Sequence, residues 1–254
     1  MPLIDTNTHL SRWPFRRVAN DTAPALIAKL KQLGVTEAWA GSYDALLHRD
    51  LSAVNERLAA DCRRHGAGFL KPIGCVNPSL PDWEEDLRRC AEVFKMKAIR
   101  LYPNYHQYDL TDARFKKLFA MAAASGLLVQ IAVMMEEERT QHPLVRVSHV
   151  DTAPLIDLLK QTPKARVMLL NGFRAVRAGL LLRLHATRRV WFDLATLEGM
   201  AGISRILKQV PVDRLVFGTA APFYIPESAI LKLKESKLTE ALLEAITFKN
   251  ARDI

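Results

Sequence analysis

The sequence predicts an α/β fold, a single (β/α)8 TIM barrel with an additional C-terminal helix. The chain has 254 residues, and a barrel of this kind typically has roughly 250. Short apolar runs rich in β-branched residues alternate with amphipathic helical stretches along the whole sequence. The starts of these runs lie roughly 30 residues apart, which is the length that one strand with its helix needs. We therefore expect one domain over residues 1–254.

Eight runs are predicted to be strands: Leu3–Thr6, Val35–Gly41, Phe69–Val76, Lys97–Tyr102, Leu127–Val133, Arg166–Leu170, Val190–Leu194 and Arg214–Gly218. No linker rich in glycine and serine separates them. An open, doubly wound sheet is the alternative, but its phosphate-binding fingerprint G-x-G-x-x-G is absent, and so is G-x-x-x-x-G-K. The closed barrel is therefore favoured.

The helices between the strands are predicted from apolar spacing and from capping residues. Leu51–Arg64 carries apolar side chains at helical intervals. Arg114–Ala124 follows Asp112, a residue type that caps helix N-termini. Pro154–Gln161 begins with proline, which the first turn of a helix accepts. The additional C-terminal helix is predicted at Thr239–Ile246.

The composition indicates which kinds of partner and which cellular compartment to expect. The 36 Lys and Arg residues exceed the 27 Asp and Glu residues, which gives a formal net charge of +9. The basic residues are spread in pairs along the chain, which favours a solvated surface over a nucleic-acid site. No apolar run reaches the ~18 residues of a membrane span, and no leader segment is recognised at the start. Three cysteines without C-x-x-C spacing indicate reduced thiols, so we expect a cytoplasmic protein. From the charge distribution and the lack of a long apolar run, we expect neither nucleic acid nor a membrane as partner.

The candidate site lies at the carboxyl ends of the strands, where barrel enzymes place their chemistry. Side chains alternate along a strand, so residue parity selects those that face the barrel interior. The residues selected are Asn7, His9, Arg100, Tyr102, Asn171 and Asp193, with His106 in the loop after the fourth strand. Among them Arg100 needs a partner, because an unpaired buried charge is very costly. That partner is either Asp193 or Asp5, or the carboxylate of a bound substrate.

Two loops are predicted to cover this end of the barrel. The segment Met134–Val150 is the longest linker and is rich in charged residues. A long loop at a barrel mouth is typical of a lid or a subunit contact, and a solvated charged loop is the alternative. The aromatic residues of Trp13–Arg17 are expected to pack against a neighbouring loop or subunit.

The sequence resembles the amidohydrolase-related (amidohydrolase 2) family of metal-dependent barrel hydrolases over nearly its whole length. Ile4–His9 is similar to the family's opening I-D-x-H-x-H, and Leu215–Pro222 to its eighth-strand pattern F-G-S-D-x-P. Arg100–His106 and Val129–Val133 are similar to its fourth and fifth strands, and Asn250–Arg252 to its C-terminal signature. The resemblance implies a hydrolase, with relatives that include decarboxylases and lactonases.

The resemblance also implies a metal site, and here the sequence departs from the family. Five positions hold the family's metal, four of them histidine and the last aspartate; in this chain they are Asn7, His9, Ala132, Asn171 and Ala220. A divalent metal needs about three imidazole, thiolate or carboxylate ligands. We therefore expect no metal cofactor, with a zinc ion held by other residues as the alternative. In the family the aspartate also acts as general base, a role that Ala220 cannot fill.

Three functional hypotheses follow. In the first, a metal-free hydrolase acts on a small carboxylate-bearing substrate such as an ester or lactone, or cleaves its C–C or C–N bond. His9 and Asp193 would be the catalytic residues, and the substrate-binding residues would be Asn7, Arg100, Tyr102, His106 and Asn171. In the second, a catalytically silent barrel binds a small anion or serves as an assembly scaffold. In the third, a metal enzyme draws its ligands from the loop 134–150. For each hypothesis we expect a homodimer.

Overall fold

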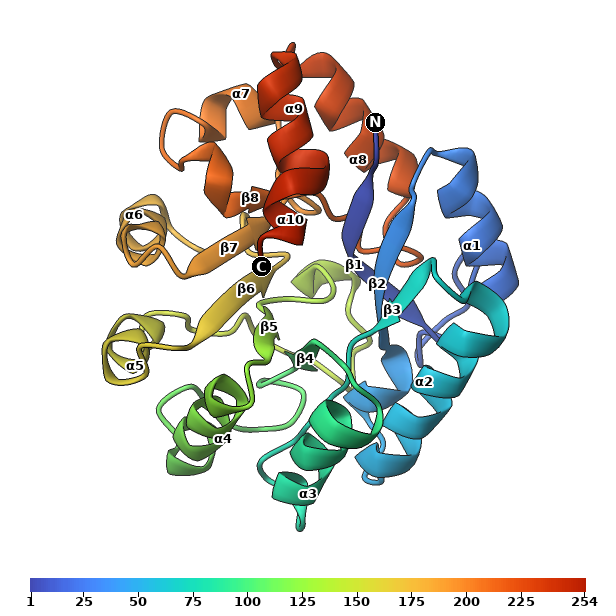
Figure 1. The fold of residues 1–254 in the computed structure, drawn as a ribbon, viewed down its shortest axis with the longest axis vertical. Helices are drawn as coiled ribbons and strands as arrows, with labels where there is room; N and C mark the ends of the chain where they lie inside the picture. Colours follow the sequence, from blue (N-terminus) through green and yellow to red (C-terminus); the bar gives the residue numbers. More distant parts are fainter.

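The computed structural model describes all residues 1–254, and it has the predicted alternation of strands and helices. Parallel strands surround the centre of the molecule and helices lie outside them (Figure 1). The strands are β1 (Ile4–Leu10), β2 (Glu37–Ser42), β3 (Leu70–Pro72), β4 (Ala98–Leu101), β5 (Leu128–Ala132), β6 (Arg166–Leu170), β7 (Val190–Asp193) and β8 (Leu215–Val216). They pair in chain order, β1 to β3 and β4 to β8.

Single bridges join these two groups of strands. Thr8 on β1 pairs with Ala221 after β8, and Gly74 after β3 pairs with Ile99 on β4. The same junctions carry backbone hydrogen bonds, such as the one from the amide of Arg100 to the carbonyl of Gly74 (2.6 Å). Backbone pairing thus continues around the ring, as the fold class requires.

The outer layer consists of helices α1 (Ala23–Gln32), α2 (Leu51–Gly66), α3 (Trp83–Arg88), α4 (Ala113–Ala124), α5 (Leu155–Gln161), α6 (Ala178–Ala186), α7 (Gly202–Ile206), α8 (Pro226–Glu235), α9 (Glu240–Glu244) and α10 (Asn250–Arg252). The predicted cap of α4 is confirmed, because the carboxylate of Asp112 accepts a hydrogen bond from the amide of Arg114 (2.8 Å). The predicted C-terminal helix begins one residue later, at Glu240, and continues through a π-helical turn into α10.

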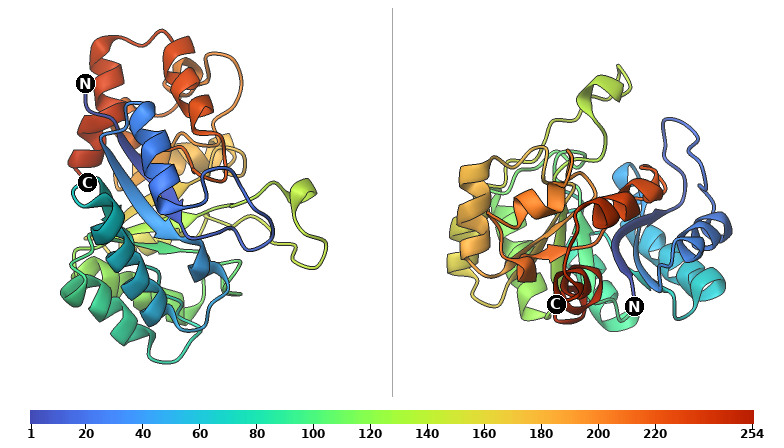
Figure 2. Two further views of the ribbon diagram at one scale, coloured as in Figure 1. Left: turned by 90° about the vertical axis from the view of Figure 1, so that its right-hand side faces the viewer. Right: turned by 90° about the horizontal axis from the view of Figure 1, so that it is seen from above.

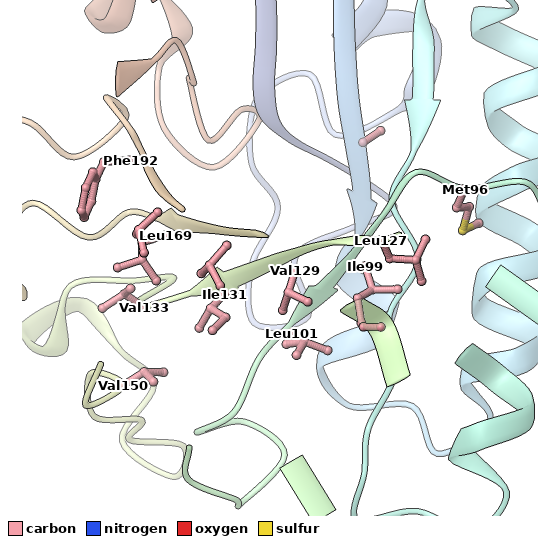
Figure 3. Close-up of a cluster of buried hydrophobic side chains, with 14 of the residues drawn as sticks. Met96, Ile99, Leu101, Leu127, Val129, Ile131, Val133, Val150, Leu169 and Phe192 are labelled. Carbon is pink, nitrogen blue, oxygen red and sulfur yellow. The ribbon is translucent and has the colours of Figure 1, made fainter. Parts of the chain in front are cut away.

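The main core lies between the strands and the helices. On β4 and β5 the apolar side chains of Ile99, Leu101, Val129 and Ile131 join this core (Figure 3). Their neighbours on the same strands belong to the barrel interior. The alternation predicted from residue parity is therefore observed, and it leaves polar side chains such as Arg100 inside the barrel.

Strand β1 is longer than predicted, because it extends past Thr6 to Leu10. Its pairing with β2 shifts register between Asp5 and Thr8, where the Asp5 carboxylate accepts a hydrogen bond from the amide of Asn7 (3.1 Å). Strand β3 is shorter and ends at Pro72, which has no amide to donate to a ladder. The extension of β1 places Asn7 and His9 on the strand itself.

The two ends of the barrel differ. Both termini lie at one end, and the loops after β1 and β5 project from the other (Figure 2). The second end is formed by the carboxyl ends of the strands, so the predicted loops do lie at the predicted mouth. Separately, the helices are all too short or too polar to cross a membrane.

Candidate active site at the carboxyl ends of the strands

The five positions that correspond to metal ligands in the resembled family lie inside the mouth of the barrel, and all are buried. Asn7 and His9 come from β1, while Ala132 is the last residue of β5. Asn171 follows β6 and Ala220 follows β8. Their exposed fractions range from 0% at Asn7 to 5% at Ala132. The predicted site residues are thus brought together, but solvent does not reach them.

Asn7, Asn171 and Asp193 form one hydrogen-bonded group. The Nδ2 atom of Asn7 donates to Oδ2 of Asp193 (2.8 Å) and to Oδ1 of Asn171 (3.0 Å). The backbone amide of Asn171 donates to Oδ1 of Asp193 (2.6 Å), and its side chain donates to the carbonyl of Met134 (2.8 Å). Burial raises the pKa of Asp193 above its ordinary value. Both oxygens of this carboxylate are therefore occupied within the protein.

Arg100 lies at the centre of the site, and neither expected aspartate is its partner. Its Nε atom donates to Oε1 of Gln130 (2.8 Å), and one terminal nitrogen donates to the carbonyl of Thr8 (2.7 Å). The other terminal nitrogen lies 3.4 Å from the carbonyls of Thr6 and Trp39. An Arg100–aspartate pair, one of the two alternatives for this residue, is not formed, because backbone carbonyls and an amide oxygen surround the guanidinium.

His9 binds the same guanidinium. Its Nε2 atom lies 2.9 Å from a terminal nitrogen of Arg100 and 3.2 Å from the hydroxyl of Tyr102. Arginine only donates, so Nε2 is an acceptor and the ring proton is on Nδ1. Burial, followed by the charge of Arg100, lowers the pKa of His9 well below its ordinary value. His9 and Asp193, both predicted to be catalytic, form no hydrogen bond with each other, because each has other partners.

Tyr102 lies beside His9, and His106 lies beside Tyr102. Burial raises the pKa of Tyr102 above its ordinary value. The Nε2 atom of His106 lies 2.8 Å from the carbonyl of Ala45, and its ring packs edge-on to that of Tyr102, with centroids 6.0 Å apart. Burial lowers the pKa of His106. Both residues therefore pack within the protein.

Aromatic side chains close the mouth above these residues. Tyr43, just after β2, stacks on the ring of His9 with centroids 4.5 Å apart. Trp13 packs edge-on against Tyr43 and Phe223, and only 2% of it is exposed. An ion pair between Arg16 and Glu136 links the loop after β1 to the loop 134–150. The predicted packing of Trp13–Arg17 on neighbouring loops is confirmed.

The free space next to this site is small. A cavity lined by Tyr102, Ala132 and Met134 has a volume of about 10 Å³, which is space for about one water molecule. Beyond its base the loop 134–150 extends away from the barrel (Figure 2), and Leu144 within it is 87% exposed. Its role as lid or subunit contact stays a prediction.

Asp5 has a perturbed pKa that gives a testable pH dependence. Its carboxylate accepts hydrogen bonds from the amide and hydroxyl of Thr219, and burial raises its pKa from 3.8 to about 7. The folded state thus holds this proton more tightly than the unfolded state. The stability that Asp5 contributes is present below about pH 4 and is lost as the pH rises to about 7.

We therefore expect Asp5→Asn to gain stability relative to the native protein as the pH rises from about 5 to about 7.5. Asparagine retains an oxygen for the amide donors and removes only the titration. Urea unfolding at several pH values measures this difference, and substitution of the exposed Asp253 by Asn is the control. Parallel curves for Asp5→Asn and the native protein would show that Asp5 does not titrate in this range.

Comparison with known proteins identifies the family. The family model described as amidohydrolase matches residues 4–254. The chain belongs to the amidohydrolase family. No curated protein matches at a significant level.

Solved structures of this family share the fold at low sequence identity. The 5-carboxyvanillate decarboxylase of Sphingomonas paucimobilis superposes with a TM-score of 0.79 at 13% identity, covering 100% of this chain and 98% of the other. A 5-carboxyvanillate decarboxylase from Novosphingobium aromaticivorans, with bound manganese, gives 0.76 at 13% identity, covering 98% and 95%. The 4-oxalomesaconate hydratase of Rhodopseudomonas palustris gives 0.70 at 14%, covering 99% and 94%.

The residues present do not fit the metal of such relatives. The structure contains no group of three or more His, Cys, Asp or Glu side chains that could hold an ion. The accepting nitrogen of His9 faces the guanidinium of Arg100 at 2.9 Å, so a divalent cation there would meet a fixed positive charge. Asp193, the nearest substitute ligand by sequence, uses its oxygens for Asn7 and Asn171.

Sequence reasoning did not assign three residues that define this site. Gln130 orients Arg100, Thr219 binds Asp5, and Tyr43 covers His9. Gln130 lies on β5 and has the interior parity that also selected Tyr102 and Asn171, whereas Tyr43 and Thr219 lie after the ends of β2 and β8, where strand alternation no longer applies. Only a distance between elements shows which partner each one binds.

Proposed function

We propose that this amidohydrolase-family barrel is catalytically silent, because its former reaction centre is now a structural polar core, and that it acts by binding. The observation that best supports this is that the hydrogen-bond donors of Arg100 are all directed at acceptors within the protein. The guanidinium is fully buried and each of its nitrogens lies next to a protein acceptor. No donor is left for the carboxylate of a substrate, so Arg100 acts here as a structural residue.

The state of His9 supports the same proposal. A general base needs a free lone pair within reach of the proton it removes. The lone pair of Nε2 is directed at Arg100, and the ring is covered by Tyr43. A water molecule in the adjacent cavity would meet Tyr102 and main-chain groups rather than an activated base.

The second candidate is the metal-free hydrolase for a small carboxylate-bearing substrate. Two buried polar atoms favour it, because Nδ1 of His9 and Oδ1 of Asn7 have no hydrogen-bond partner in the protein. Buried polar atoms are rarely left without partners, so these two could contact a ligand once the aromatic cover opens. The solved relatives named for decarboxylation or hydration also act on carboxylates.

Turnover assays separate the two candidates. The purified protein is incubated with carboxylated lactones, aryl esters and hydroxybenzoates, with and without added Mn²⁺ or Zn²⁺. We expect no turnover above that of buffer, and the same background for His9→Gln. The exposed His48 provides a matched control variant, His48→Gln. Turnover that His48→Gln retains and His9→Gln loses, at an unchanged melting temperature, would establish the hydrolase instead.

A further inference from the structure

A second hollow lies at the opposite end of the barrel, away from the polar site. It has a volume of about 360 Å³, within the range of small-molecule pockets. Its lining includes the first residues of four strands, namely Glu37 of β2, Ala98 of β4, Leu128 of β5 and Arg166 of β6. In Figure 1 the C-terminus lies over the middle of the ring at this end. Of the residues named at the mouth only Trp39 recurs here, and there it was its main-chain carbonyl, 3.4 Å from Arg100, that took part.

The inner wall of the hollow is apolar. Ile73, Ala98 and Leu128 belong to a buried cluster that fills the lower barrel interior. Trp39 and Ile254 pack against this cluster and remain partly exposed. An occupant would therefore touch aliphatic side chains and one indole, which suits an apolar body rather than a hydrated ion.

The rim of the hollow is strongly basic. Five cationic side chains line it: Lys71, Lys95, Lys97, Arg166 and Arg252. The only carboxylate side chain in the lining is Glu37, which lies 3.3 Å from Arg252 and 3.9 Å from Lys71 and accepts from the indole of Trp39 (3.0 Å). Lys95 and Lys97 form no ion pair, so positive charge is in excess.

These residues are far apart in the sequence, and only the barrel brings them together. Like charges around a low-dielectric hollow repel one another, and a bound anion would relieve that repulsion. Polyanions such as nucleic acids would use the charge but not the enclosed apolar wall. The combination favours a small ligand with an anionic head and an apolar body.

We propose that the hollow at the amino ends of the strands binds a small organic carboxylate with an apolar body about the size of one aromatic ring. The carboxylate lies among the rim cations around Lys97, and the ring lies against Trp39 and the wall formed by Ala98 and Leu128. This proposal rests on the binding role proposed above and names the class of ligand that is bound. The test of the proposal does not depend on whether the mouth of the barrel is catalytic.

Titration calorimetry with benzoate tests the proposal, and the double variant Lys95→Gln/Lys97→Gln locates the site. Both lysines are exposed, so the fold should persist, which the melting temperature checks. We expect saturable 1:1 binding that is weakened about tenfold or more in the double variant. The exposed Lys234 on α8 provides the control Lys234→Gln, which should bind benzoate like the native protein.

Two further probes separate the head from the body of the ligand. Neutral benzamide retains the ring, and inorganic phosphate retains only charge. We expect each to bind at least about tenfold more weakly than benzoate. The proposal is overturned by the absence of saturable benzoate binding, by binding that the double variant retains, or by phosphate binding as tightly as benzoate. None of these outcomes depends on turnover, so they are distinct from a failure of the silent-barrel proposal.

Discussion

Replacement of Arg100 by methionine is expected to lower the free energy of unfolding by about 3–5 kcal/mol, because several buried acceptors lose their donor at a cost of about 1–3 kcal/mol each. Methionine is apolar, so the acceptors around Arg100 lose their donor inside the barrel. The carbonyl of Thr8 and the Oε1 atom of Gln130 would be the most affected, because they make the shortest contacts with the guanidinium. Urea unfolding followed by circular dichroism measures the difference.

A surface arginine supplies the control. Arg57 on α2 is half exposed and lies 3.6 Å from Asp44, so Arg57→Met should change stability by no more than about 0.5 kcal/mol. If Arg100→Met is as stable as Arg57→Met, the guanidinium does not hold the barrel interior together. Arg100 would then regain its place as a candidate for ligand binding.

Gly218→Ala is the substitution with the second-largest expected effect. A Cβ atom at Gly218 would lie 2.7 Å from Oδ2 of Asp193 and 3.1 Å from Cβ of Asn7. The carboxylate cannot move aside freely, because Oδ2 accepts the hydrogen bond from Asn7. We expect a loss of about 1–3 kcal/mol in the free energy of unfolding, typical of an overfilled interior.

The matched control is Gly179→Ala in helix α6, where an added Cβ would meet no atom within 4 Å. Alanine is a better helix former than glycine, so Gly179→Ala should gain about 0.5–1 kcal/mol. Opposite signs for the two variants would show that the cost at Gly218 is specific to the Asn7–Asp193 contact. If Gly218→Ala leaves the free energy of unfolding unchanged, the residues around the Asn7–Asp193 contact have room for an added methyl group.

Most of the fold could be predicted because its signals are local. Strand β6 has its predicted bounds, Arg166–Leu170, since β-branched and aliphatic residues run without interruption there. Strand β1 was predicted too short because polar residues interrupt its apolar pattern. Those polar residues face a barrel interior that is itself polar at this end. Side chains from other strands make it polar, so the local sequence pattern of β1 does not show it.

The sequence predicted which residues lie in the candidate site, but not which groups each of them binds. Residue parity selected Arg100 and Asp193 for the interior, and the sequence left open whether Arg100 pairs with Asp193, with Asp5 or with the carboxylate of a substrate. In the structure each is satisfied by uncharged groups, Arg100 by carbonyls and Asp193 by amides. Backbone carbonyls are present in every sequence, so no residue pattern shows where they point.

Family membership and activity are separable in this chain, as they are for barrel folds generally. The match to the amidohydrolase family covers residues 4–254, and the supporting geometry of the barrel is retained. Ala132 and Ala220 stand at two of the positions that the sequence resemblance assigns to the family's metal ligands. Cytoplasmic location and a homodimer stay predictions.

Metal content tests the central claim most directly, namely that the family's reaction centre has become a structural core. The protein is purified without chelator from cells grown with added zinc and manganese, and both metals are quantified per chain by plasma mass spectrometry. Because the site lacks three suitable ligands and places a guanidinium against His9, we predict far less than one equivalent of either metal. About one equivalent in the native protein, lost in His9→Ala, would contradict the account.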